Sequence, residues 1–204
     1  MKTNKVLVMS MLAAAFMCSC SSEEEPAVAG GEKAISLSAG INDAVTRAVI
    51  SSGYNDPLNV TFGRIDNPTG ASTWQALNAV RAGGSGNTAI SFSAVQTYAA
   101  ANVASYLVGF YPRASFTSTS DPATVSYAIT GDQDLMATAI QEGKADTPFE
   151  AFTFNHLLSQ LQFKCLGSEE AKKKWGAIKS VKVKDVPSNL VLAINKNNRI
   201  RFLR

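Results

Sequence analysis

The sequence predicts an all-β protein, a single β-sandwich that runs from about Ala34 to Arg204. Short segments rich in β-branched and aromatic residues recur along the chain, and Gly, Asn, Asp and Pro separate them at intervals of roughly 8–12 residues. Several of these segments alternate apolar and polar residues, which is the period of a strand with one buried face. Signals for helices are few. Together these observations favour a sandwich domain.

The predicted strands begin with Ala34–Ile41, in which apolar residues alternate with serine and glycine. Val103–Tyr111 is apolar on both faces, as expected of a central strand, and Pro112 ends it. Gln75–Val80 fits either a turn or a strand. The other predicted strands are Asn59–Asp66, Thr88–Val95, Thr124–Thr130, Leu135–Gln141, Asn155–Cys165, Ala177–Val186 and Asn189–Asn195, with Ile200 and Phe202 in a last one.

The predicted strand Asn155–Cys165 is expected to contribute side chains to the core. Its apolar residues alternate with glutamine and lysine, so Leu161, Phe163 and Cys165 are predicted to face inward. Cys165 is therefore expected to be a buried structural thiol rather than a reactive one.

One short helix is predicted after this strand. Ser168 is a capping residue, acidic residues follow it, lysines occupy the last turn and Gly176 closes the helix. These charges complement the helix dipole, so the lysine run is interpreted as a solvated turn rather than an anion site.

The first 19 residues have the features of a signal peptide. Lys2 and Lys5 form a cationic start, and the apolar run Val6–Met17 follows. That run is shorter than the roughly 18–20 residues that cross a bilayer as a helix. It therefore fits a cleavable export signal.

Two cysteines at the end of this run indicate a lipoprotein. Cys20 follows the small residue Ser19, whereas Cys18 follows the bulky Met17, so cleavage is expected between Ser19 and Cys20, with lipid on Cys20. Residues 20–33 are then a lipidated, flexible tether. A plain secretory signal is the alternative. Lipidation of Cys20 leaves Cys165 without a partner, so no internal disulfide is expected.

Charge argues against nucleic acid as a partner. Loss of Lys2 and Lys5 lowers the formal net charge from +3 to near +1. The run Ser21–Glu25, placed directly after the lipidated cysteine, resembles the surface-export signal of lipoproteins from the Bacteroidetes. The protein is therefore expected at the outer surface of the outer membrane.

Candidate catalytic and metal-binding residues are scarce. His156 is the single histidine, and the sequence has no His-x-x-x-His pair and no Gly-x-Ser-x-Gly elbow. We interpret His156 as a structural imidazole at a strand end, bonded to the backbone. The glycine-rich segment Gly83–Asn87 lacks the Lys-Ser/Thr ending of a phosphate loop and is interpreted as a hairpin or loop. No enzymatic activity, metal or cofactor is expected.

A cleavable arginine lies between the first two predicted strands. Arg47 and Ala48 stand among small residues, with the turn-forming residues Gly53–Pro57 behind them. This is a chemically suitable site for an arginine-specific protease.

Five segments, in this order, resemble the fimbrillins of the Bacteroidetes, in particular the minor-fimbria-like group. They are the lipidation site with its acidic follower, Thr46–Ala48, Gly109–Pro112, Asp134–Ala137 and Phe154–Phe163. The last, an aromatic residue, a histidine and then alternating apolar residues, is the most specific.

The resemblance implies a structural or adhesive fimbrial subunit, exported as a palmitate-bearing surface lipoprotein. Its sandwich is expected to be transthyretin-like, of the fimbrillin N-terminal domain type. Cleavage of the Arg47–Ala48 bond would remove the N-terminal segment 34–47, and a strand from another subunit would fill the groove. Other fimbrial subunits and the outer membrane are the implied partners, and a host or bacterial surface ligand is a further candidate.

Family members are usually longer than this chain, which stops at Arg204. The resemblance therefore implies that a second domain is absent, either because the chain is C-terminally truncated or because the subunit accepts a strand without donating one. A different class of function stays open: an outer-surface lipoprotein that binds glycans through its sandwich, for which Trp74 and Trp175 are the available tryptophans.

Overall fold

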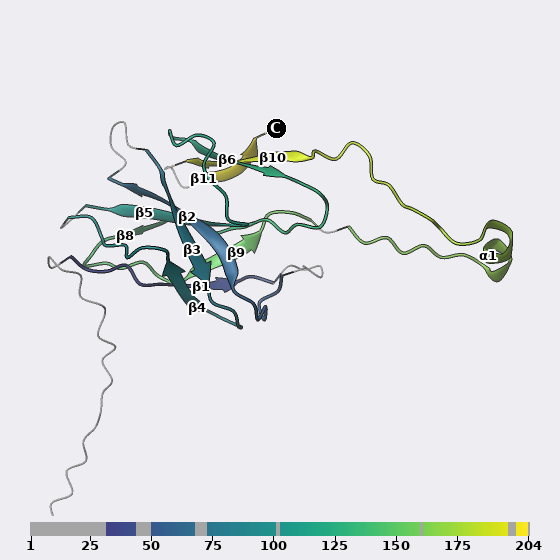
Figure 1. Ribbon diagram of the computed structural model, residues 1–204, viewed down its shortest axis with the longest axis horizontal. Coiled ribbons are helices and arrows are strands. Elements are labelled where there is room, and N and C mark those ends of the chain that lie inside the picture. The colour runs from purple at the N-terminus through teal and green to yellow at the C-terminus, as the bar shows by residue number, and fades with distance from the viewer. Residues whose placement is uncertain are drawn as a thin grey trace, which may run out of the picture.

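The computed structural model describes residues 32–43, 50–67, 73–100, 103–159, 161–195 and 199–203. Strands dominate these residues, and the expected all-β class is confirmed (Figure 1). The elements are β1 (Leu37–Ile41), β2 (Leu58–Asp66), β3 (Gln75–Arg81), β4 (Thr88–Phe92), β5 (Ser105–Tyr111), β6 (Ala123–Ala128), β7 (Met136–Ala137), β8 (Gln141–Gly143), β9 (Phe152–His156), α1 (Glu169–Trp175), β10 (Asn189–Asn195) and β11 (Arg199–Leu203).

The larger sheet has the strand order β2-β3-β4-β1-β9-β7-β5-β8, and β2 also pairs with β5. This extra pairing closes the sheet on itself. Neighbouring strands are antiparallel except β1 and β9, which run parallel. The segment that fitted either a turn or a strand is β3, in register with β2 from Leu58↔Arg81 to Arg64↔Gln75.

The smaller sheet has the order β11-β10-β6 and lies against one side of the larger sheet (Figure 1). Its central strand β10 pairs with β6 from Asn189↔Ala128 to Ile194↔Ala123. On its other edge β10 pairs with β11, so the predicted last strand with Ile200 and Phe202 is confirmed.

The described residues form two hydrophobic cores, and β5 contributes to both. Leu107 packs in the first core, which the strands of the larger sheet enclose. Val108 and Phe110 point the other way into the second core, between the larger sheet and β6 and β10. The prediction that this segment is a central strand with two apolar faces is therefore confirmed. The second core lies between two sheets, and the pairing of β2 with β5 closes the larger sheet on itself; the sandwich and its transthyretin-like arrangement stay a prediction.

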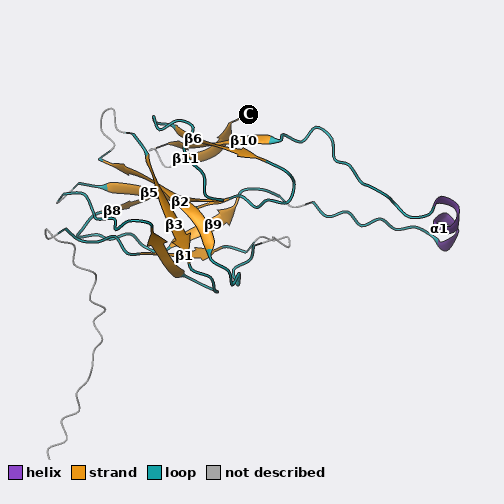
Figure 2. Cartoon of the chain, in the orientation of Figure 1, coloured by secondary structure: helices purple, strands orange, loops and turns teal. Residues whose placement is uncertain are grey.

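Residues 161–188, here called the arm, extend away from both sheets and carry α1 at their far end (Figure 2). The predicted helix is confirmed with its caps. Ser168 Oγ accepts a hydrogen bond from the Ala171 N–H at 3.2 Å, and the Gly176 N–H donates to the Lys172 carbonyl at 2.9 Å. Gly176 has a φ of 70°, which favours glycine. In the described residues, no helix is long and apolar enough to span a bilayer.

The arm corrects three predictions. The predicted strand Asn155–Cys165 ends at His156, and Leu161 and Phe163 are 66% and 57% exposed instead of facing the core. Cys165 is exposed rather than buried. The residues of the predicted strand over 177–186 are not in a strand, and Asp185 within them has a φ of 61°. The physical reason is common to all three: alternation favours a strand only where a neighbouring strand supplies hydrogen bonds, and no described strand lies beside the arm.

Candidate assembly site

The residues predicted to be processed, Ser19, Cys20, Arg47 and Ala48, lie outside the described residues. The strand predicted to be removed with them is described. It corresponds to β1, and before it Ala34 forms an isolated bridge with Thr97. The surroundings of β1 therefore test what its removal would expose.

β1 lies in the interior of the larger sheet, between β4 and β9 (Figure 1). Leu37 pairs with Ile90 of β4 in antiparallel register, and Ala39 and Ile41 pair with Phe152 and Phe154 of β9 in parallel register. Both edges of β1 are thus hydrogen-bonded to neighbouring strands. We call the space that β1 fills between β4 and β9 the β1 groove.

The side chains of this segment fill part of the first core. Ile35, Leu37, Ala39 and Ile41 alternate as predicted, and all four are buried. They share that core with Phe62 of β2, whose ring meets the ring of β9 residue Phe152 edge-on at a centroid distance of 5.2 Å. Burial of a large aliphatic side chain contributes about 1.5–3 kcal/mol. The three large side chains of the segment therefore contribute on the order of 5–9 kcal/mol, similar to the stability of a whole domain.

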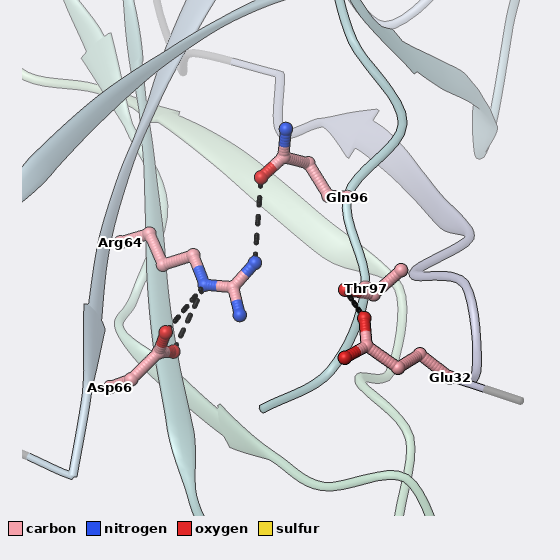
Figure 3. Close-up of polar contacts among 5 residues, drawn as sticks. All are labelled: Glu32, Arg64, Asp66, Gln96 and Thr97. Carbon is pink, nitrogen blue, oxygen red and sulfur yellow. Dashed lines mark hydrogen bonds and ion pairs between the residues drawn. The ribbon is translucent and has the colours of Figure 1, made fainter. Parts of the chain in front are cut away.

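Polar contacts hold the N-terminal end of the segment. Thr97 Oγ1 donates to Glu32 at 2.8 Å, and the Ile35 N–H donates to the Gln96 carbonyl at 2.8 Å. Figure 3 shows that Gln96 is in turn tied to β2, because Arg64 Nη1 donates to its side-chain oxygen at 3.4 Å. Arg64 also forms an ion pair with Asp66 at 2.9 Å.

A second set of contacts holds the C-terminal end of the segment. The Asn42 N–H donates to the Phe154 carbonyl at 2.9 Å. The Asp43 carboxylate accepts from the Ser52 N–H at 2.7 Å and from Ser52 Oγ at 2.8 Å. These bonds from Ser52 hold the pKa of Asp43 below its usual value. We call this pair the Asp43–Ser52 clamp; it joins the chain on the two sides of the segment that contains Arg47.

Arg81, which sequence reasoning did not assign to the site, reaches β1 from β3. Its side chain is fully buried, and its Nε donates to the Ala39 carbonyl at 2.9 Å. Its Nη2 donates to the carbonyls of Gly84 and Gly86 at 3.1 and 3.0 Å. The sequence carried one signal of this arrangement, since the glycine-rich segment Gly83–Asn87, correctly interpreted as a loop, follows directly after Arg81.

His156 lies at the end of β9, as predicted for a strand end, but its described hydrogen bond goes to a side chain and not to the backbone as expected. Its Nδ1 lies 2.9 Å from Oδ1 of Asp134, and both side chains are 8% exposed. A carboxylate beside an imidazole orients the ring. Among the described residues, the buried Nε2 atom of His156 has no hydrogen-bond partner. Among the described residues no group of three or more His, Cys, Asp or Glu side chains is arranged to hold a metal ion.

The arm presents a second, apolar surface. Trp74 is buried in the second core, whereas Trp175 is 79% exposed at the end of α1. A hollow of about 660 Å³ lies beside it, lined in part by Leu166, Ala171 and Ile178. Further exposed apolar side chains lie in the arm before and after α1: Leu161, Phe163, Val181, Val183 and Val186.

Comparison with known proteins identifies a family for this chain. A family model described as fimbrillin-like matches residues 46–193, a region that begins after β1 and includes the whole arm. No curated protein and no solved structure matches the chain. The matched family is one of structural, fimbrial proteins of the cell surface rather than of enzymes. Because the match covers more than half of its length, the chain belongs to the fimbrillin-like family.

Proposed function

We propose that this fimbrial protein is exported as a surface lipoprotein and assembles by strand exchange through the β1 groove. Signal cleavage after Ser19 leaves Cys20 as the lipidated N-terminus, which anchors the precursor in the outer membrane. Cleavage of the Arg47–Ala48 bond then separates β1 from the rest of the domain, and a strand of another subunit takes its place.

The position of β1 is the observation that carries this proposal. β1 lies between two strands in the sheet interior, yet in sequence it precedes the region that the family model matches. Its loss would open two strand edges, on β4 and β9, together with an apolar slot. Free strand edges pair readily with other extended segments. In strand addition the backbone bonds supply affinity, and pockets for alternate side chains supply specificity.

The contacts at both ends of the segment that contains β1 support an exchange that occurs only when a partner strand is present. A cut after Arg47 would leave the Glu32–Thr97 contact, the pairing of β1 and the Asp43–Ser52 clamp in place. The cut segment would also keep its buried apolar side chains. A nicked subunit would therefore stay folded and soluble until a competing strand displaces the segment.

Expression in a Bacteroidetes host tests this function. Surface extracts of the wild type, kept unboiled, should form a ladder of polymers on a denaturing gel, and the ladder should collapse on boiling. Arg47→Ala should give monomers alone, while Arg113→Ala, which alters an exposed arginine outside the β1 groove, should leave the ladder unchanged. A ladder that persists in Arg47→Ala would refute assembly through this cut.

A further inference from the structure

Arg81 is fully buried, and no carboxylate among the described residues pairs with it. Four of its N–H groups donate to main-chain carbonyls, namely those of Ala39, Ala82, Gly84 and Gly86, at 2.9–3.1 Å. Burial lowers the pKa of its guanidinium, because desolvation disfavours the charged form. The charge is thus stabilised by carbonyl dipoles, which makes each of these bonds important.

Three of the four acceptors belong to the β3–β4 connection, which is fixed independently of β1. The Gly84 N–H donates to the Tyr54 carbonyl at 2.8 Å. Gly83 lies so close to the backbone that a Cβ there would come within 1.8 Å of the Asn55 carbonyl oxygen. The guanidinium is therefore held in place by the loop, and only the fourth acceptor, the Ala39 carbonyl, would depart with β1.

An empty β1 groove would leave Arg81 Nε as a buried, charged donor without its acceptor. Leaving a buried charged donor unpaired costs more free energy than losing an ordinary neutral hydrogen bond. A strand that enters the groove restores the bond only when one of its carbonyls reaches the level of Ala39. Successive carbonyls of a strand point to opposite sides, so in a strand displaced by one residue the carbonyl at this level would point away from Arg81 Nε. At the same level the side chain of Ala39 is fully buried, which favours a small residue.

We infer that Arg81 is the residue that retains and aligns the strand in the β1 groove, so that one strand leaves only as another supplies its carbonyl. This inference rests on the proposed strand exchange, to which it adds the requirements on the partner. The partner is an extended segment with a small residue at the level of Ala39, flanked two positions away by large apolar residues at the levels of Leu37 and Ile41.

The first test uses the intact chain and requires no cut. In Arg81→Met, amide hydrogen exchange of β1 should become at least tenfold faster relative to exchange of β10, which lies in the other sheet. Arg113→Met is the matched control, because Arg113 also donates to carbonyls, but to those of Val60 in β2 and Ala79 in β3. Equal β1-to-β10 ratios in the two variants would overturn the inference. Arg81→Lys keeps the charge but replaces the guanidinium with a single donor nitrogen, so its β1-to-β10 exchange ratio should lie between those of the wild type and Arg81→Met. It is the variant to use if Arg81→Met does not fold.

The second test uses chain nicked between residues 43 and 50, with the site verified by mass spectrometry. The probe is a synthetic peptide with the sequence of residues 32–43. Wild-type protein should release its N-terminal segment only when the peptide is added, whereas Arg81→Met should release it at least tenfold faster in buffer alone. Release that depends equally on the peptide in both proteins would refute the retention role. A changed exchange ratio without uptake of peptide by any variant would refute strand exchange and leave the contact of Arg81 with β1 intact.

Discussion

Phe154 and Phe163 provide a matched pair of substitutions that tests where the core ends. The two residues belong to one continuous alternating segment, but Phe154 is fully buried on β9 and Phe163 is 57% exposed on the arm. The Phe154 ring meets Phe62 edge-on at 6.3 Å between centroids, and it packs so closely on Gly109 that a Cβ there would lie 2.9 Å from its tip. Phe154→Ala would leave a cavity that the rigid backbone at Gly109 cannot close.

Phe154→Ala should therefore lower the free energy of unfolding by roughly 3–5 kcal/mol. For a domain of this size the melting temperature should fall by about 6–20 °C. Phe163→Ala should change the free energy by less than about 0.5 kcal/mol, as for most exposed positions. Urea titration followed by tryptophan fluorescence measures both, because Trp74 is buried. Losses of similar size in the two variants would show that the arm packs on the domain and that the assigned end of the core is wrong.

Three further predictions concern the steric fit, the anchor and the clamp. Gly109→Ala should cost roughly 1–3 kcal/mol by overpacking, measured by the same titration, while Gly53→Ala, where a Cβ meets nothing within 4 Å, should be close to neutral. Cys20→Ala should abolish incorporation of a fatty-acid analogue and Cys18→Ala should not; label lost only in the second variant would reverse the assignment. The lowered pKa of Asp43 means that its clamp is complete above the usual carboxyl range and is lost as the pH falls through the lowered value. Asp43→Asn at pH 7 should therefore lower the protection of the residue 52 amide, measured as its exchange rate relative to the intrinsic rate at the same pH; equal protection in both proteins would contradict the clamp.

Elements specified by local sequence could be predicted. β5 is recognisable because both of its faces are apolar and a proline follows it, and α1 because its caps and charges all lie within one short segment. The alternation of Ile35, Leu37 and Ala39 likewise identified the strand that fills the β1 groove. In each case the residues that determine the element are neighbours in the chain.

Features that depend on distant partners could not be predicted in the same way. The alternation over Leu161 and Phe163 resembles that of β9, but only pairing distinguishes a strand from exposed extended chain. In the sequence, Arg81 cannot be distinguished from an ordinary basic residue. Its role depends on the Ala39 carbonyl, which is 42 positions away in sequence and contacts Arg81 only in the folded chain. The contact between His156 and Asp134 is likewise set by the pairing of β7 with β9.

The most direct test of the central claim is to identify the first cut and to follow what it causes. An arginine-specific protease is needed, because exposed lysines such as Lys173 and Lys179 lie along the arm. Arg64 and Arg81 are buried in strands, so we predict a first product that begins at Ala48, appears before any cut at the exposed Arg113, and stays folded. That product should then self-associate in sedimentation experiments, and a peptide of residues 32–43 should block the association. A first product that begins elsewhere, or Arg47→Ala protein that associates as the wild type does, would contradict assembly by strand exchange at β1.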